Sequence, residues 1–321
     1  MKNKIIIVSG DSNSINSEII CKMWNKTSDR IKKKIYLITN FEMFKKQVRK
    51  LGFRTKLIKV KNIKETFNNN NLKIIDINLN FKDPFKVSYS ENSKFVLKSL
   101  SLAHTVGMDE KVKGIINCPI DKKLLQTTGK VGVTEFFASK NNIKNNSEVM
   151  LIYNKNFSVV PLTTHINVDQ ISKKIEKNLI IQKIKTLGNF FRSRFRKNPK
   201  IGMLGLNPHN SEFTKNSKEV KVITPSILNL KKKGYNIKGP YSADTMFVND
   251  YKNFDIVVGM YHDQILTPFK TIFKFDAINI TLGLKYIRVS PDHGTAKNLI
   301  KKNKSNPLSL IRCVEFLDKI N

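Results

Sequence analysis

Short apolar runs alternate with amphipathic stretches along the whole chain. Apolar runs of about four to eight residues are typical of buried strands, and apolar residues at every third or fourth position are typical of a helix with one buried face. We expect strands at 4–9, 34–39, 72–77, 114–117, 149–153, 157–163, 200–206, 254–260 and 277–282. We expect helices at 17–25, 41–51, 94–106, 168–194, 219–232 and 307–319.

This alternation of strand and helix predicts an α/β fold. Strands separated by helices form a largely parallel sheet with helices on both faces. A length of 321 residues suits one large unit or two domains. The last helix could pack back on the first domain, which would make that domain discontinuous.

Composition narrows the class of protein. A formal charge of +33 is typical of proteins that bind nucleic acid. However, the basic residues are spread from Lys2 to Lys319, and only eight of them are arginines. Because base and phosphate recognition favours the planar arginine fork, we expect no nucleic acid to bind. No apolar run approaches the roughly 18 residues that a membrane span needs. Three widely spaced cysteines predict no disulfide framework, and a cytoplasmic location follows.

Three of the five histidines stand directly after apolar runs. His165, His209 and His262 follow the runs 157–162, 201–206 and 255–260. If these runs are parallel strands, all three imidazoles lie at carboxyl ends, the edge at which open α/β sheets bind ligands. Imidazole is also the commonest metal ligand, so the pattern predicts a divalent metal site. Each histidine alone could instead be a hydrogen-bonded loop residue.

Other polar residues have two interpretations each. Thr134 follows the glycines at 129 and 132, where backbone N–H groups at a helix start could hold an anion or simply form a capped loop. Asp244 is either an oxygen ligand or a helix N-cap.

A carboxylate, a lysine, an amide and an arginine lie between positions 262 and 288. Oxidation of a phosphorylated hydroxy acid needs such a set, because a metal polarises the hydroxyl while cations hold carboxylate and phosphate. The residues are Asp263, Lys270, Asn279 and Arg288.

Five segments, in family order, resemble the 4-hydroxythreonine-4-phosphate dehydrogenase family. They are 162–165, 205–209, 260–264, 279–284 and 290–296, and the likeness runs from Ile5 to about Leu317. The resemblance implies two α/β/α domains with mostly parallel sheets, like those of isocitrate and isopropylmalate dehydrogenases. It also implies a homodimer with a shared active site in the interdomain cleft. We expect 1–125 plus 295–321 to form the first domain, and 126–294 to form a second domain that carries the metal site and dimer interface.

The resemblance also implies a reaction. The family oxidises 4-phosphohydroxy-L-threonine with NAD or NADP and one divalent metal ion (zinc, manganese, cobalt or magnesium). The resulting 3-keto acid decarboxylates to 3-amino-2-oxopropyl phosphate in vitamin B6 (pyridoxal phosphate) biosynthesis.

Residue roles carry over onto the matched positions only. The metal ligands would be His165, His209 and His262, and the substrate-binding residues Thr134, Lys270, Asn279 and Arg288. Lys270, Asp244 and Asp263 would be catalytic. The nucleotide would contact His293, Gly294, Thr295 and Ala296.

This sequence departs from the family pattern in two places. Val133 stands where the family has a histidine that contacts substrate, which favours weaker binding or another phosphorylated hydroxy acid, such as threonate or erythronate phosphate. In the loop 10–18 only Gly10, Asp11, Ile15 and Glu18 match, and the glycine-rich turn after Ala296 is replaced by 297–303. A non-enzyme alternative is an inactive or nucleic-acid-binding paralogue.

Overall fold

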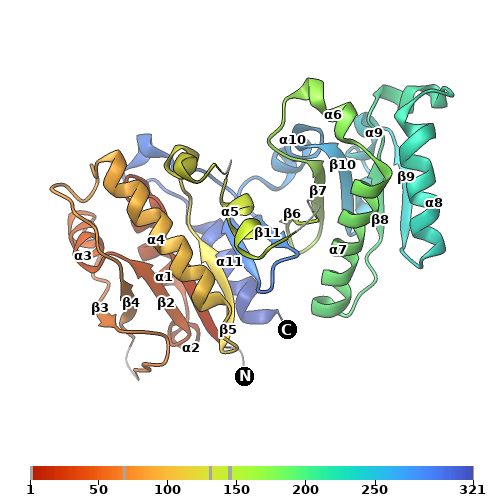
Figure 1. Cartoon of the computed structure of the whole chain (residues 1–321). Coiled ribbons are helices and arrows are strands. Elements are labelled where there is room, and N and C mark those ends of the chain that lie inside the picture. The colour runs from red at the N-terminus through yellow and green to blue at the C-terminus, as the bar shows by residue number, and fades with distance from the viewer. Residues whose placement is uncertain (1–2, 68–69, 130–131, 144–146, 321) are drawn as a thin grey trace. The chain divides into compact units, whose positions relative to one another are not determined.

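The computed structural model describes residues 3–67, 70–129, 132–143 and 147–320 (Figure 1). The chain forms two compact units. The first contains Met1–Asn141 and Lys285–Ile320, and the second contains Asn142–Leu284.

The first unit is built on a parallel sheet with the strand order β3-β4-β2-β1-β5-β12. Every residue of β1 and β2 is buried, which explains why these strands are continuous apolar runs. The strands are β1 (Lys4–Val8), β2 (Ile35–Thr39), β3 (Leu57–Val60), β4 (Leu72–Asp76), β5 (Val112–Asn117) and β12 (Arg288–Pro291).

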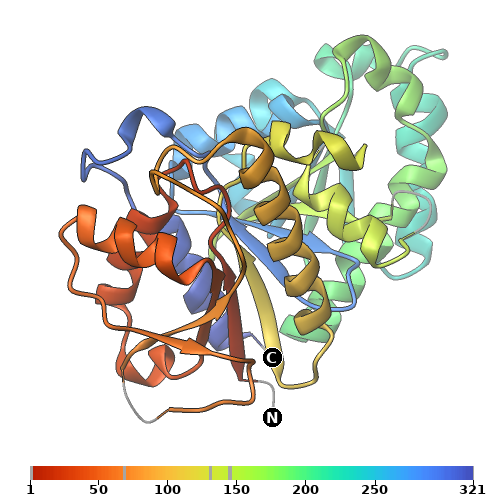
Figure 2. The same cartoon turned by 60° about the vertical axis from the view of Figure 1, so that its left-hand side comes forward.

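Helices cover both faces of this sheet. Helix α4 packs on one face, and α1, α3 and α11 pack together on the other, as the two views show (Figures 1 and 2). The α-helices are α1 (Asn16–Lys26), α2 (Asp29–Lys32), α3 (Phe41–Lys50), α4 (Tyr89–Gly107), α5 (Val133–Lys140) and α11 (Leu308–Lys319). The 3-10 turns are η1 (Lys122–Thr128) and η5 (Lys297–Leu299).

In the second unit the strand order is β11-β6-β7-β10-β8-β9, and most neighbouring strands are parallel. Strand β6 is antiparallel to both neighbours, and β7, β10 and β8 are adjacent and parallel. The strands are β6 (Val149–Tyr153), β7 (Ser158–Thr163), β8 (Ile201–Leu204), β9 (Ile237–Tyr241), β10 (Ile256–Tyr261) and β11 (Ile278–Leu282).

The core of the second unit lies under α10, where Phe157, Val257, Ile265 and Phe269 are buried together. Helix α7 packs against β6, β7 and β11 and contacts α8. The helices are α6 (Val168–Lys174), α7 (Lys177–Phe195), α8 (Thr224–Lys232), α9 (Ala243–Met246) and α10 (His262–Phe273). Shorter turns are η2 (Pro208–Phe213), η3 (Glu219–Ile223) and η4 (Asp250–Asn253).

The predicted α/β architecture with mostly parallel sheets is confirmed, but the boundaries lie elsewhere than we expected. Segments 126–141 and 285–294 belong to the first unit. The reason is packing: β12 pairs with β5, and the Tyr286 ring makes edge contacts with His104 and Phe137. The single helix expected at 168–194 is wrong, because the chain is extended at Ile175 and Glu176 and two helices form instead.

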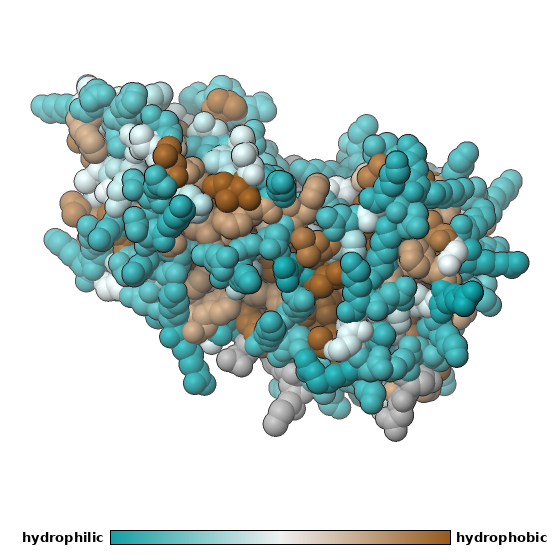
Figure 3. Space-filling view, turned by 180° about the vertical axis from the view of Figure 1, so that it is seen from behind, coloured by the Kyte–Doolittle hydropathy of each residue, from teal (hydrophilic) through white to brown (hydrophobic). Residues whose placement is uncertain are grey.

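The surface, the helix lengths and the cysteines bear on the predictions made from composition. The face seen in Figure 3 is mostly hydrophilic, with hydrophobic side chains in smaller groups. Among the helices of the described residues, none has the length and apolar character needed to cross a membrane. Cys21, Cys118 and Cys313 are all free and buried, as expected for a chain without a disulfide framework.

Candidate active site

The three histidines lie at one edge of the second unit's sheet. His165 follows β7, His262 is the first residue of α10 directly after β10, and His209 lies in η2 after β8. Because β7, β10 and β8 are adjacent and parallel, their carboxyl ends lie at one edge (Figure 1). The prediction that three parallel strands carry these histidines at their carboxyl ends is confirmed.

Two of the imidazoles are close together. The ring centroids of His165 and His262 are 6.0 Å apart. Nδ1 of His262 lies 2.6 Å from Oδ1 of Asp263, to which it donates a hydrogen bond, and this leaves Nε2 for a ligand. A carboxylate that orients an imidazole in this way is the usual partner of a metal-binding histidine.

The backbone at two of the histidines is strained. His165 and His209 have φ values of 45° and 48°, in the left-handed region that residues other than glycine seldom adopt. Such strain costs about 1–3 kcal/mol per residue and concentrates at functional sites. No group of three or more His, Cys, Asp or Glu side chains in the described part of the chain is arranged to hold a metal ion. The metal ligand set therefore stays a prediction.

A buried carboxylate that we did not predict from the sequence anchors the His209 loop. Glu219 has no exposed surface, and its Oε1 accepts hydrogen bonds from the backbone N–H groups of Leu206 (2.8 Å) and Asn207 (2.9 Å). Burial acts to raise the pKa of Glu219, but these hydrogen bonds outweigh burial and the pKa is lowered. No local motif signals this contact, because it joins an irregular loop to a π-turn.

Arg288 and Thr134, both expected to bind substrate, lie together in the first unit. Nη1 of Arg288 donates to Oγ1 of Thr134 at 3.3 Å, and Nε donates to Oδ1 of Asn117 at 2.6 Å. Arg288 is buried, and this burial lowers its pKa to about 10, so the guanidinium is still a cation at neutral pH. Thr134 is not the helix N-cap: Gly132 occupies that position, and Thr134 is the second residue of α5. Positions 130–131 of the expected anion-binding segment are outside the described residues.

Lys270, Asn279 and Asp244 lie in the second unit. Lys270 is exposed on α10, eight residues and about two turns after His262. Asn279 is in β11, and its buried Oδ1 has no hydrogen-bond partner among the described residues. Asp244 is exposed in the first turn of α9. Ser242 is the N-cap of α9, so the N-cap interpretation of Asp244 is wrong.

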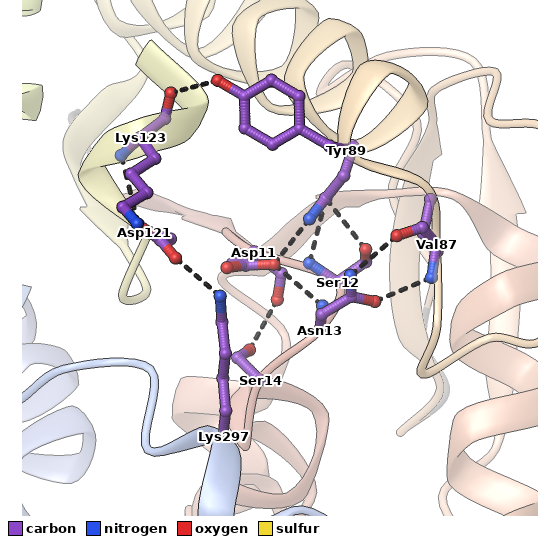
Figure 4. Close-up of polar contacts among 10 residues, drawn as sticks. Asp11, Ser12, Asn13, Ser14, Val87, Tyr89, Asp121, Lys123 and Lys297 are labelled. Atoms are coloured by element: carbon purple, nitrogen blue, oxygen red, sulfur yellow. Dashed lines mark hydrogen bonds and ion pairs between the residues drawn. The ribbon is translucent and has the colours of Figure 1, made fainter. Parts of the chain in front are cut away.

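The divergent loop at 10–18 is well ordered by its own polar residues, as Figure 4 shows. Gly10 has φ 74°, and a Cβ there would lie 2.6 Å from the carbonyl oxygen of Pro119, so only glycine fits. Oδ1 of Asp11 accepts hydrogen bonds from the backbone of Asn13 and from Asn92, at 2.8 and 2.7 Å. Side-chain hydrogen bonds of this serine- and asparagine-rich sequence therefore fix the loop's conformation.

The expected nucleotide-binding loop, from His293 to Ala296, lies beside this divergent loop. The carbonyl oxygen of Thr295 accepts a hydrogen bond from the backbone N–H of Ile15 at 3.2 Å. One residue beyond Ala296, Lys297 pairs with Asp121 at 2.6 Å (Figure 4). The divergent loop thus contacts the expected nucleotide-binding loop, and the replaced segment 297–303 begins directly after that loop.

Comparisons with known proteins identify the family. The family model described as "Pyridoxal phosphate biosynthetic protein PdxA" matches residues 31–317. The chain belongs to this family. It is 36% identical over 319 residues to the 4-hydroxythreonine-4-phosphate dehydrogenase of Sulfurihydrogenibium sp. (strain YO3AOP1), covering 98% of this chain and 97% of that protein. It is 33% identical over 329 residues to that of Aquifex aeolicus (strain VF5), covering all of both.

A solved structure of the same family agrees with the fold. The 4-hydroxythreonine-4-phosphate dehydrogenase of Klebsiella pneumoniae superposes with a TM-score of 0.85 at 25% identity, and the match covers 98% of each chain. The relatives named here are dehydrogenases, which are oxidoreductases that act on a CH–OH group.

Proposed function

We propose that this protein is a metal-dependent dehydrogenase that oxidises 4-phosphohydroxy-L-threonine with NAD or NADP, and that the 3-keto acid product loses carbon dioxide to give 3-amino-2-oxopropyl phosphate. The observation that carries the proposal is the position of His165, His209 and His262 at the ends of three adjacent parallel strands, in a chain of this family.

The donor set suits a divalent transition metal. Three neutral imidazoles favour zinc or cobalt over magnesium, which prefers oxygen ligands. Rings 6.0 Å apart can both reach one ion, and Asp263 fixes the orientation of His262. A metal bound there would lower the pKa of the substrate hydroxyl and later stabilise the negative charge that decarboxylation leaves.

The chain's own residues bind the substrate and accept its proton. Arg288 and Lys270 are cations suited to the carboxylate and phosphate groups. Thr134 and Asn279 offer a hydroxyl and an amide for hydrogen bonds, and the unpartnered Oδ1 of Asn279 can accept one from the substrate. Asp244 or Asp263 would take the hydroxyl proton, while the hydride leaves the same carbon for the nicotinamide ring.

We place the nucleotide on the loop from His293 to Ala296. The hydrogen bond from Ile15 to Thr295 and the pairing of Lys297 with Asp121 support this, because they hold the loop in a fixed conformation next to the start of α1. Helix N-termini favour phosphate groups.

We also propose a homodimer that associates through the second unit. Six of the eight large apolar side chains that are exposed in the described residues belong to it, and such side chains mark an interface where they gather into one patch. They are Val168, Phe213, Leu228, Val248, Ile272 and Phe275.

Two alternatives differ in substrate or class. Val133, half-buried at the start of α5 and next to Thr134, favours a different phosphorylated hydroxy acid such as threonate or erythronate phosphate. An inactive or nucleic-acid-binding paralogue is disfavoured, because the curated relatives are named as enzymes. Formation of reduced nicotinamide by the wild type and His209→Ala tests the proposal: only the wild type should turn over.

A further inference from the structure

A short chain of hydrogen bonds joins the three strand ends that carry the site histidines. Oγ1 of Thr163 donates to the carbonyl oxygen of Met260 at 2.8 Å. The backbone N–H of Met260 donates to Oε1 of Gln264 at 2.7 Å, and Nε2 of Gln264 donates to the carbonyl oxygen of Gly205 at 2.8 Å. Met260 thus binds the end of β7 directly through its C=O, and it is linked to the segment after β8 through the Gln264 side chain.

The Thr163 bond lies at the last paired residue of β7, and the Gln264 bond to Gly205 lies beyond the paired part of β8. The pairing of β10 with β8 ends at Val258 and Met203, and that of β10 with β7 ends at Tyr261 and Thr163. Beyond the end of β8, the side-chain amide of Gln264 links Met260 to Gly205 in place of backbone hydrogen bonds. His165 and His262 come two residues after the bonded Thr163 and Met260, and His209 comes four after Gly205.

The Gln264 side chain is closely packed against its neighbours. A Cβ added at Gly259 would lie 2.9 Å from Oε1 of Gln264 and 2.3 Å from Cγ2 of Ile265. At Gly205 an added Cβ would lie 2.0 Å from Oδ1 of Asn210 and 3.2 Å from Oε1 of Glu219. Glycine at position 259 therefore leaves room for the Gln264 amide, and glycine at position 205 leaves room for Asn210 and Glu219.

The loop beyond Gly205 is held from its other side as well. The next two backbone N–H groups, of Leu206 and Asn207, donate to the buried Glu219. The left-handed conformations of His165 and His209 are unfavourable for L residues, so they need surroundings that hold them. Thr163, Gln264 and Glu219 are the side chains that hold the segments leading to all three histidines.

We propose that Gln264 and Thr163 are positioning residues, which set the spacing of the three histidine-bearing loops and so determine how tightly those histidines hold a divalent metal. The inference rests on the proposed metal site. Supporting groups around metal ligands typically change metal affinity by about 10- to 100-fold when they are removed. Neither side chain needs to touch the metal or the substrate for this effect.

The test is a titration of the full-length apo protein with Co²⁺, whose visible absorption reports both binding and the number of ligands. Gln264→Met removes both amide hydrogen bonds at nearly constant volume, and Thr163→Val removes the hydroxyl while keeping the shape. Thr163→Ser keeps the hydroxyl. Gln47→Met is the matched control, because buried Gln47 also donates to two carbonyl oxygens, those of Ser12 and Pro84, but in the first unit.

We expect Gln264→Met and Thr163→Val to weaken Co²⁺ binding by about 10- to 100-fold and to alter its spectrum. Thr163→Ser and Gln47→Met should stay close to the wild type. Wild-type affinity and spectrum in both Gln264→Met and Thr163→Val would overturn the inference. Melting temperatures of the apo proteins check the fold, and if Gln264→Met does not fold, the Thr163 pair decides.

The same titration tests the proposed metal site separately from the positioning role of Gln264 and Thr163. His209→Ala gives the background of Co²⁺ held elsewhere on the protein. If the wild type binds no more Co²⁺ than His209→Ala does, the metal site itself is wrong. If the wild type binds above that background and the positioning variants do likewise, the metal site stands and the inference fails.

Discussion

Nε of Arg288 donates a hydrogen bond of 2.6 Å to Oδ1 of Asn117. The two residues come from neighbouring strands, since Asn117 ends β5 and Arg288 begins β12. Arg288 also donates to Thr134, and its guanidinium lies 6.0 Å from the centroid of the Phe137 ring. A buried cation is thus held in one orientation, as binding of a substrate anion requires.

The orientation of Arg288 predicts the effect of a conservative change. Arg288→Lys keeps the charge but loses the planar fork, so we expect KM for 4-phosphohydroxy-L-threonine to rise roughly 10- to 100-fold, the equivalent of a lost charge-assisted hydrogen bond. Steady-state kinetics measure it. Arg312→Lys, which changes a half-exposed arginine paired with Glu315, is the control and should leave KM unchanged. An unchanged KM in Arg288→Lys would remove Arg288 from the substrate site.

Val133 predicts a change in specificity. Val133→His adds a polar group directly before Thr134. We expect the ratio of kcat/KM between 4-phosphohydroxy-L-threonine and a threonate or erythronate phosphate to change about tenfold or more. The reason is that a hydrogen bond to a charged group contributes about 1.5–3 kcal/mol. Met108→His, at an exposed position of the first unit, controls for the added imidazole. Equal ratios in the wild type and Val133→His would show that position 133 does not select the substrate.

Glu219 predicts a pH-dependent loss of stability. At pH 7, Glu219→Gln should cost about 1.5–3 kcal/mol, since the charged acceptor of two backbone N–H groups is lost. The pKa of Glu219 is lowered in the folded protein, so its contribution is present above its ordinary value of 4.5 and disappears as the pH falls through the folded value. Thermal unfolding of wild type and variant at several pH values measures the gap. Glu315→Gln, on an exposed pair, should show almost none; a Glu219→Gln gap that does not change with pH contradicts the prediction.

Lys73 predicts a variant that is more stable than the wild type. This lysine is 1% exposed, and burial, with the charge of Lys4 acting in the same direction, lowers its pKa from 10.5 to about 8. Between these values the unfolded chain binds more protons, so stability at this site rises with pH. Lys73→Met should therefore be more stable than wild type at pH 7, by up to about 3 kcal/mol.

That advantage should shrink as the pH rises toward 10.5, which urea unfolding at pH 7 and pH 10 would measure. The hydrogen bonds from Lys73 to the carbonyl oxygens of Lys32 and Lys33 offset part of the gain. Exposed Lys98→Met is the control for a lost positive charge. A destabilised Lys73→Met at pH 7 would mean that those hydrogen bonds outweigh the cost of burial.

The fold was predictable wherever an element buries a continuous apolar surface. The strands at 4–8 and 149–153 are such cases. Strand β9 was missed because it contains Gly239 and Pro240, which are unfavourable in strands. The break in the expected long helix was invisible in the sequence, because Ile175 keeps the apolar period while its backbone is extended.

The candidate site was predictable only where it depends on strand ends. The positions of His165, His209 and His262 follow from the strands before them, whereas contacts between distant side chains and backbone do not. Gln264 and Gly205 are 59 positions apart, and no local pattern joins them. The N-caps show the same limit: Ser242 rather than Asp244 starts α9, since the boundary depends on where β9 ends.

The most direct test of the central claim is formation of reduced nicotinamide from 4-phosphohydroxy-L-threonine, followed by absorbance, with NAD or NADP and with or without a chelator. We predict turnover by the wild type that the chelator abolishes and that Zn²⁺ or Co²⁺ restores, and no turnover by His209→Ala. Turnover that is unaffected by the chelator and persists in His209→Ala would contradict a catalytic metal held by His165, His209 and His262.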